Sequence, residues 1–328
     1  MIDQIFERER SIGLLRQMQT IRTFETRVEV LFKDGHLPGF VHSYAGQEAI
    51  AVGVCSCLTK SDYITSTHRG HGHAIAKGIS LNAIFAELYG KETGTCSGKG
   101  GSMHVADFSI GMLGANGIVG GGFGIATGAA LAMKYLKKPE VAVCFFGDGA
   151  ANKGTFHEAL NFAGVHKLPV IFVCENNRYA QFTSASRTTA IEDISIRAQS
   201  YGIVGDSIDG NDLTAVIDSA HRAIERARAG EGSTLLNMRT YRHSGHFVGD
   251  PEEYRASEEV QQSKDVGDPI TRFTELLISR EIISPSELEN LNTEVSAQIE
   301  RAHEFAQASD YPDASEALRD VWTDGGAR

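Results

Sequence analysis

From residue 141 onward, short apolar runs alternate with segments of helical length and periodicity. Strands are predicted at 141–146, 170–175, 203–208 and 234–239, with helices near 156–166, 191–201 and 213–228 between them. This alternation is typical of a parallel sheet covered by helices on both faces. It therefore predicts an α/β fold with a doubly wound, mostly parallel sheet, in which ligands bind at the carboxyl ends of the strands.

Two of these apolar runs end in polar residues that suit a hard cation. Gly147-Asp148-Gly149 follows the first run, and Asn176-Asn177 follows the second. Either group alone could form a plain turn or a helix cap. Together, at the ends of neighbouring strands, they offer the carboxylate and carboxamide oxygens that Mg²⁺ accepts and often shares with a substrate phosphate. The pair predicts a Mg²⁺ site that holds a phosphorylated cofactor.

Helices are also predicted on both sides of this α/β region. Apolar residues at helical spacing indicate helices over 8–33, 47–58, 81–88 (with Ser80 as N-cap), 125–136, 269–283 and 284–306, with a polar loop over 241–268. We therefore expect an N-terminal helical extension (1–60), a cofactor-binding α/β domain (61–265) and a C-terminal helical segment (266–328), all packed as one unit.

The segment from Gly94 to Gly124 is unusually rich in glycine, with 11 glycines in 31 residues and no short repeat. Glycine at this density lets the backbone approach a ligand and exposes amide donors. A set of tight turns is the simpler alternative. Because apolar residues are interspersed and a helix follows, we predict a loop that faces the ligand.

Charge and composition exclude several classes of function. The formal net charge is −11, the pI is near 5.6, and no basic block is present, which argues against a nucleic-acid partner. No apolar stretch is long enough to span a bilayer, and the first ten residues lack a signal-peptide core. The five cysteines form no CxxC pair or disulfide framework, so we expect reduced thiols in a cytoplasmic protein.

Seven motifs, in order along the chain, resemble those of one enzyme family. They are His42–Glu48, Ser66–His73, Gly98–His104, Gly117–Gly120, Gly147–Asn152, Glu175–Tyr179 and Thr240–His246. The chain is similar to α subunits of thiamine diphosphate-dependent 2-oxoacid dehydrogenases over about residues 20 to 280. The segments Ser66–His73 and Gly245–Pro251 look closer to acetoin dehydrogenases. Animal pyruvate dehydrogenases carry a phosphorylatable serine where this chain has Phe247, which excludes that control here.

The resemblance implies a role for each matching position. The Mg²⁺ ligands of the family resemble Asp148, Asn177 and the main-chain carbonyl of Tyr179. The diphosphate is expected to pair with Arg69, beside His68, which stands where many pyruvate-type relatives have tyrosine, and to lie near the backbone of Gly149 and Ala150. The aminopyrimidine is expected to pack on Gly117 and Val119. His246 resembles the loop histidine near the substrate channel, and His42 another active-site histidine. Proton handling suits an imidazole, although a structural hydrogen bond is the alternative for His246.

Three histidines, His68, His71 and His73, also invite a zinc interpretation. Their spacing fits no common zinc pattern, and Arg69 within the group would repel a second cation. We therefore expect Mg²⁺ and thiamine diphosphate as the cofactors, without zinc.

The resemblance also implies that a second polypeptide completes the active site. In this family, the glutamate that activates the cofactor comes from a β subunit, so we expect an α/β heterotetramer with sites between subunits. The expected reaction is cleavage of acetoin, or decarboxylation of pyruvate or a related 2-oxoacid, followed by transfer of the acyl unit to a lipoyl acyltransferase. One alternative is acyl transfer to a carrier protein or carbonyl acceptor without a lipoyl partner. Another is a non-enzymatic subunit, which would be expected to lack Asp148, Asn177 or Arg69; all three are present.

Overall fold

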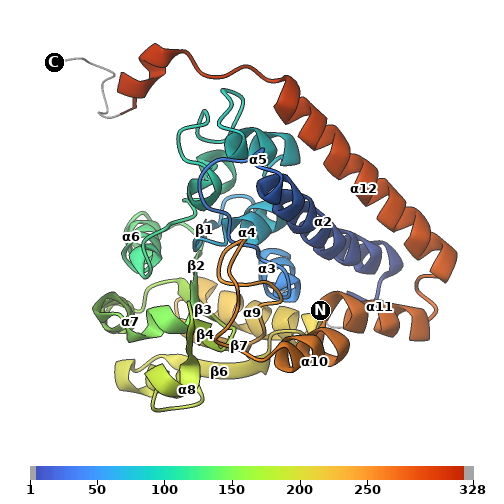
Figure 1. The fold of residues 1–328 in the computed structure, drawn as a ribbon. Coiled ribbons are helices and arrows are strands. Elements are labelled where there is room, and N and C mark those ends of the chain that lie inside the picture. Colours follow the sequence, from blue (N-terminus) through green and yellow to red (C-terminus); the bar gives the residue numbers. More distant parts are fainter. Residues whose placement is uncertain (1–4, 321–328) are drawn as a thin grey trace.

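A parallel five-stranded sheet forms the centre of the computed structural model, which describes residues 5–320 (Figure 1). The strands are β1 (Tyr63–Thr65), β2 (Ala142–Gly147), β3 (Val170–Asn176), β6 (Val204–Asp209) and β7 (Thr234–Arg239). Their order in the sheet is β1-β2-β3-β7-β6, and every neighbouring pair is parallel. A two-stranded antiparallel ribbon, β4 (Tyr179–Ala180) with β5 (Thr183–Ser184), follows β3.

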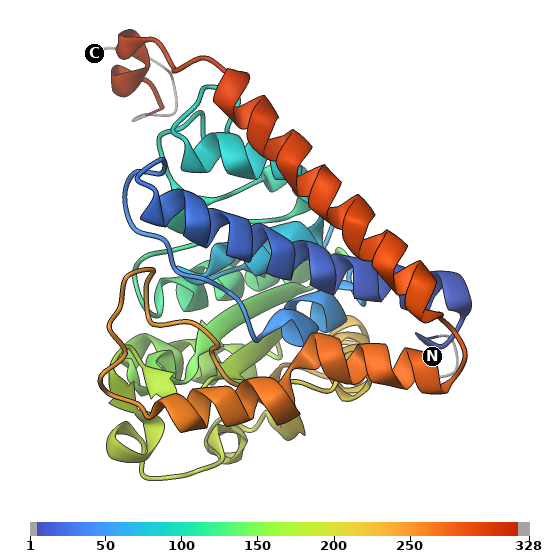
Figure 2. The same ribbon diagram turned by 45° about the vertical axis from the view of Figure 1, so that its right-hand side comes forward.

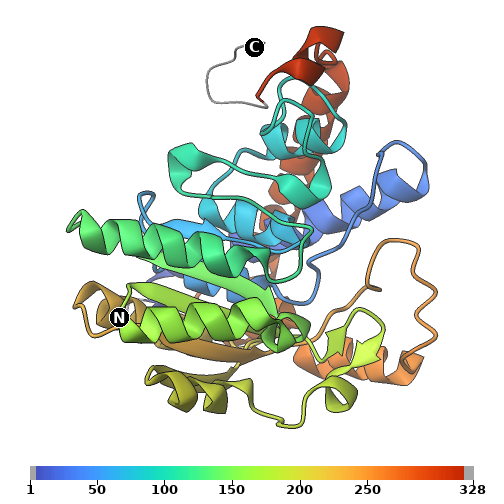
Figure 3. The same ribbon diagram turned by 90° about the vertical axis from the view of Figure 1, so that its left-hand side faces the viewer.

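Both faces of the sheet are buried, which explains why its strands are continuous apolar runs. Along β2, Val143 and Phe145 belong to one apolar core, whereas Cys144 and Phe146 belong to the core on the opposite face. In Figure 3 the helices α6 and α7 cover the second of these faces. The helices that cover the sheet and its edges are α3 (Glu48–Cys55), α4 (Gly70–Lys77), α6 (Gly121–Tyr135), α7 (Gly154–Val165) and α9 (Leu213–Arg228). The predicted doubly wound, mostly parallel α/β fold is confirmed.

Long helices from both ends of the chain pack together beside this sheet (Figure 2). They are α2 (Arg8–Lys33), α11 (Pro269–Ser279) and α12 (Pro285–Ala308). The short helix α5 (Leu81–Leu88) packs against α12, and α10 (Ser257–Gly267), which has no buried side chain, precedes α11. Arg22 connects α2 with α3 and α11, because its guanidinium pairs with buried Glu48 at the start of α3 and with Asp268, the residue before α11. The predicted helical extensions are thus present; the boundaries at residues 60 and 265 stay predictions. No helix within residues 5–320 is long and apolar enough to cross a membrane.

Several local predictions were wrong. The predicted loop 241–268 contains α10, whose side chains are not buried, so it lacks the apolar stripe that reveals a helix. The segment near 191–201 is a 3₁₀ helix, Ile194–Tyr201, and Ser80 precedes α5 without a capping hydrogen bond from its side chain. The helix α4 was not predicted, because all of its residues are buried and no amphipathic period remains.

Further short elements connect these parts. They are α8 (Ala185–Thr188) and 3₁₀ turns at Ser102–His104, Phe108–Ile110, Asp148–Asn152 and Ala314–Leu318. The turn Asp148–Asn152 matters most for function, because it follows β2 directly and places Asp148 at the carboxyl edge of the sheet.

Candidate functional site

Asp148 and Asn177 follow two neighbouring strands at the same edge of the sheet. Gly147, the last residue of β2, is in register with Glu175 of β3; Asp148 follows Gly147 directly, and Asn177 follows Asn176, the last residue of β3. Carboxyl ends of adjacent parallel strands form the crevice in which open α/β sheets bind ligands. The structure therefore places both predicted metal ligands at one end of the sheet.

The Asp148 carboxyl group is buried, and one of its two oxygen atoms lacks a hydrogen-bond donor among residues 5–320. Its side chain is 2% exposed, and its Oδ2 atom makes no hydrogen bond within the described residues. Burial raises the pKa of this carboxyl to about 6, because the charged form loses its hydration. An unpaired buried carboxylate is costly unless a cation or donor accompanies it. The arrangement therefore suits a bound cation.

Gln47 fixes the orientation of the Asn177 side chain. The Asn177 amide nitrogen donates to Gln47 Oε1 at 3.1 Å, which directs the amide oxygen the other way. That oxygen accepts a hydrogen bond only at long range, 3.4 Å from the Tyr179 backbone nitrogen. Asn177 can thus offer a carbonyl-type oxygen to a hard cation, as Mg²⁺ requires.

The cavity at this edge, of about 330 Å³, brings all the predicted site residues together. Its lining includes His42, His68, Arg69, Gly117, Val119, Asp148, Gly149, Ala150, Asn177, Tyr179 and His246. These residues come from six of the seven motifs, spread over about 200 positions of the chain, and a shared cavity is what the resemblance requires. The individual role of each residue stays a prediction.

Three histidines from different segments meet in this cavity. The ring nitrogens of His42, His68 and His246 can approach within 4.8 Å of one another. Burial, followed by the neighbouring Arg69 charge, lowers the pKa of His42 to about 3 and that of His246 to about 4, and holds the His68 pKa well below its usual value. All three are therefore neutral at pH 7. Arg69 beside them disfavours a second metal here.

The histidines of the rejected zinc group separate in the structure. His71 and His73 point away from His68 and lie against buried carboxylates, with His71 Nδ1 3.2 Å from Glu25 Oε1 and His73 Nε2 2.9 Å from Glu175 Oε1. The imidazoles of His71 and His73 thus have carboxylate partners of their own, whereas His68 lines the cavity. The three side chains do not form one group that could hold a zinc ion.

Sequence reasoning missed a buried polar network behind the cavity wall. His73 joins Glu175 on one side and Ser66 on the other, with 2.7 Å between its Nδ1 and Ser66 Oγ, and Tyr44 donates to the Glu175 carboxylate. Ser66 lines the cavity and starts the turn that carries His68 and Arg69. All four residues lie within the motifs that carried the resemblance, but only the folded chain shows their contacts.

The glycine-rich segment splits into two parts with different roles. Residues 116–120, together with Gly122, line the cavity, as predicted for a loop that faces a ligand. In the earlier part Met103 also lines the cavity, but the prediction of a ligand loop is wrong for residues 96–101, which wrap around the buried Glu87 carboxylate of α5. This carboxylate accepts hydrogen bonds from the backbone nitrogens of Cys96, Gly98, Gly100 and Gly101 at 2.7 to 3.0 Å. The chain's own carboxylate thus takes the place expected for an anionic ligand.

Gly149 needs to be glycine for a packing reason. A Cβ atom at this position would lie 2.7 Å from the Cβ of Ala180 in β4, closer than side chains approach. The turn after β2 can therefore pack directly under β4, which carries Tyr179 toward the cavity.

Comparison with known proteins identifies the chain's relatives. The family described as dehydrogenase E1 component matches residues 16–315, nearly the whole chain. The chain belongs to this family. Family membership implies thiamine diphosphate as the cofactor, in agreement with the cavity at the carboxyl edge of the sheet.

Individual relatives of this E1 component chain cover almost its entire length. It is 50% identical over 314 residues (96% of this chain, 94% of the relative) to the α subunit of acetoin:2,6-dichlorophenolindophenol oxidoreductase from Bacillus subtilis. It is 47% identical over 316 residues to the protein of the same name from Cupriavidus necator (96% and 95% covered). The α subunit of the pyruvate dehydrogenase E1 component from Rhizobium meliloti is 40% identical over 316 residues (96% and 91% covered).

Proposed function

We propose that this E1 component chain is the α subunit of a dehydrogenase that cleaves acetoin, or decarboxylates pyruvate or a related 2-oxoacid, and passes the acyl unit to a lipoyl acyltransferase. The observation that carries the proposal is the buried Asp148 Oδ2 atom, which has no hydrogen-bond partner among residues 5–320, in a cavity lined by Asn177 and all the other predicted cofactor residues. The names of its relatives, with greater identity to the acetoin enzymes, favour acetoin as the first substrate to test.

In this proposal the chain holds the diphosphate end of the cofactor. Asp148, Asn177 and the Tyr179 carbonyl would hold Mg²⁺, and Arg69 would pair with the diphosphate through its fork of donors. Gly117 and Val119 would pack on the aminopyrimidine, and Gly149 and Ala150 would present backbone to the diphosphate. When bound, thiamine diphosphate supplies a thiazolium carbon that adds to a carbonyl and acts as an electron sink.

Neutral histidines complete the chemistry that the chain itself can contribute. His42, His68 and His246 line the cavity, and low pKa values keep their imidazoles uncharged at pH 7. A neutral imidazole can accept a proton from a substrate hydroxyl and return it to the product. We assign this proton handling to His246 and His42, while Arg69 holds His246 in place by donating to its backbone carbonyl at 2.8 Å.

A β subunit would complete the site from outside. The cavity wall includes Ile118 and Val119, whose apolar side chains are largely exposed in the isolated chain. Exposed apolar residues at the rim of a cavity are typical of a surface that another chain covers. We propose that the β subunit covers this side and supplies the glutamate that activates the cofactor.

The test is to purify the chain alone and together with its β subunit, and to measure substrate-dependent reduction of 2,6-dichlorophenolindophenol. We expect acetoin, pyruvate and branched 2-oxoacids to differ in rate with the pair, and negligible turnover with the single chain. Full activity of the single chain would contradict the divided site. An inactive pair that still binds Mg²⁺ and thiamine diphosphate would instead contradict the substrate assignment.

The outer face of α6 provides a second prediction about the β subunit. Gly124, Gly128, Leu131 and Tyr135 recur at helical spacing on its exposed side, and added Cβ atoms at both glycines would meet open space. An exposed helix face is normally polar, so this one suits a closely packed partner. Leu131→Asp is expected to weaken α/β association by about tenfold or more, measured by analytical ultracentrifugation. Ile278→Asp on α11, where exposure is similar (38% against 40%), is the matched control and should leave association unchanged.

A further inference from the structure

A second buried arginine, Arg242, lies in the same cavity as Arg69. The two residues are 1% and 3% exposed, which makes Arg242 one of the largest fully buried side chains of the described region. Arg242 belongs to the Thr240–His246 motif, but the proposed function assigns it no contact with the cofactor. Its surroundings show what it could bind.

Neither guanidinium has a carboxylate within ion-pair distance among residues 5–320. Arg69 donates to the backbone carbonyls of Ser43 and His246. Arg242 donates from Nε to the Ser244 carbonyl at 3.2 Å, and from Nη2 to the Gln181 carbonyl at 3.2 Å and the Tyr254 hydroxyl at 2.7 Å. By contrast Arg255, from the same loop, pairs with Glu252 at 2.6 Å. The two cavity arginines are therefore held by neutral groups.

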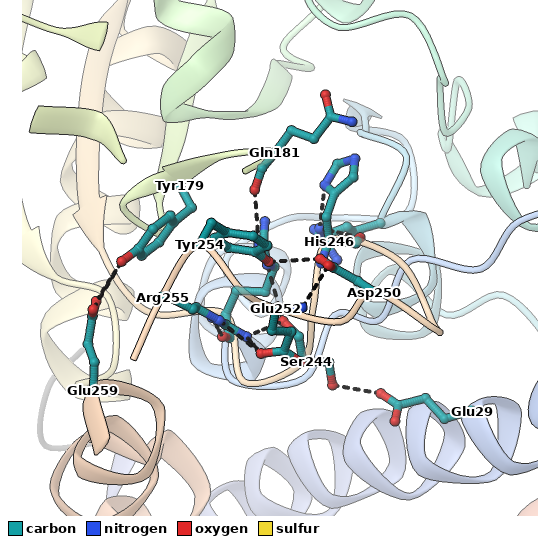
Figure 4. Close-up of polar contacts among 12 residues, drawn as sticks. Glu29, Tyr179, Gln181, Ser244, His246, Asp250, Glu252, Tyr254, Arg255 and Glu259 are labelled. Atoms are coloured by element: carbon teal, nitrogen blue, oxygen red, sulfur yellow. Dashed lines mark hydrogen bonds and ion pairs between the residues drawn. The ribbon is translucent and has the colours of Figure 1, made fainter. Parts of the chain in front are cut away.

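The loop after β7 fixes the orientation of Arg242. Figure 4 shows two residues of this loop, Tyr254 and Asp250, with the hydrogen bond between them. Tyr254 accepts a hydrogen bond from Arg242 and donates to Asp250 at 2.8 Å, and Asp250 also accepts from the His246 backbone nitrogen at 2.6 Å. These contacts use Nε and Nη2 of Arg242. The remaining terminal nitrogen, Nη1, makes no hydrogen bond with the described residues, which leaves one end of the fork free at the cavity.

Two buried like charges without ion-pair partners favour an anion between or beside them. Burial, and then the Arg242 charge, lower the pKa of Arg69 to about 9, and burial also lowers the Arg242 pKa. The desolvation of each cation is offset only when an anion supplies charge and acceptors. With Mg²⁺ at Asp148, the positive charges of both guanidinium groups would be needed to balance the negative charge of a diphosphate together with that of the Asp148 carboxylate.

We propose that Arg242 binds the diphosphate of the cofactor together with Arg69, through the guanidinium nitrogen that its protein contacts leave free. This inference rests on the proposed function, because it requires a diphosphate in the cavity. It also gives the Gln181, Tyr254 and Asp250 contacts a purpose: they position Arg242 before the cofactor arrives, so that little side-chain order remains to be gained on binding.

The test measures the affinity of the assembled α/β protein for Mg²⁺ with inorganic diphosphate, and for Mg²⁺ with thiamine diphosphate, by isothermal titration calorimetry. Arg242→Met is expected to weaken both by about 10- to 100-fold, as for loss of a charge-assisted contact. Arg228→Met is the control, because Arg228 pairs with buried Asp62 just before β1, contacts neither Arg242 nor its loop, and does not line the cavity. It is expected to change either affinity by less than about threefold.

The outcomes separate this inference from the proposed function. If the unchanged protein does not bind Mg²⁺ and thiamine diphosphate, the proposed function is wrong. If it binds and Arg242→Met binds equally well, or loses no more than Arg228→Met, the inference alone is overturned. Should Arg242→Met fail to fold, phenylglyoxal modification of the unchanged protein decides, with peptides mapped by mass spectrometry. Mg²⁺ with diphosphate must then slow modification of Arg242 but not of Arg228, and equal rates with and without diphosphate at Arg242 would overturn the inference.

Discussion

Asp148→Ala is expected to weaken Mg²⁺-dependent binding of thiamine diphosphate by more than about 100-fold, since loss of a residue that only orients a metal ligand already costs about 10- to 100-fold. The physical reason is that in the proposed site Asp148 would supply the buried anionic oxygen, since its Oδ2 atom has no partner among residues 5–320. Titration of the α/β protein with thiamine diphosphate at several Mg²⁺ concentrations checks this expectation. Unchanged affinity and Mg²⁺ dependence would refute the metal assignment.

The stability of the unliganded protein distinguishes this effect from misfolding. Burial raises the folded-state pKa of Asp148 to about 6, above its value of 3.8 in the unfolded chain. The folded state thus binds the proton more tightly, and stability from this group falls as pH rises through that range. At pH 7 without ligand, Asp148→Ala should therefore melt no lower than the unchanged protein. Asp209→Ala, at the carboxyl end of β6 and outside the cavity, is the control and should leave cofactor binding intact.

The sheet and its functional edge could be predicted because they rest on local patterns. β2 and β3 are apolar runs that end in polar residues, and a parallel sheet brings such ends together whatever the rest of the chain does. Asp148 and Asn177 could therefore be paired before any long-range contact was known. The same reasoning placed the long helices α2, α9 and α12, whose apolar residues recur at helical spacing.

The parts that could not be predicted depend on contacts between distant segments. Arg242 reaches Gln181, and His68 meets His42 and His246, only because four separate segments of the chain converge at this edge of the sheet. Nothing local in the sequence distinguishes Arg242 from Arg255, although one lines the cavity and the other pairs with Glu252. The helix α4 escaped prediction for a similar reason, since complete burial removes the alternation of polar and apolar residues on which such predictions depend.

In the glycine-rich segment the expected arrangement of backbone amides around an anion is present, but the anion differs from the one predicted. Glycines do let backbone amides converge on an anion, but at residues 96–101 the anion is Glu87 of the chain itself. Gly94 is required there, because an added Cβ would lie 2.4 Å from Glu87 Oε2. Composition alone cannot tell whether such amides surround an internal carboxylate or a ligand.

Glu87→Gln is therefore expected to lower the free energy of unfolding by roughly 3–5 kcal/mol, the scale of leaving several buried donors poorly satisfied. The carboxamide keeps the shape of the side chain, but it loses the charge and turns an NH₂ group toward backbone N–H donors. Urea denaturation of the chain, or of the α/β protein if the single chain is insoluble, measures the change. The Cys96 thiol gives a local readout, because a loosened segment should react faster with a thiol reagent.

The control for this variant is Glu92→Gln, a change of the same chemistry at an exposed glutamate four residues after α5. It should alter the free energy of unfolding by no more than about 0.5 kcal/mol, as for other surface substitutions. An equal effect of the two variants, or unchanged stability and Cys96 reactivity for Glu87→Gln, would contradict the role of the internal carboxylate. A loss confined to Glu87→Gln would show that this half of the segment is organised by the protein itself, and that its order does not depend on the cofactor.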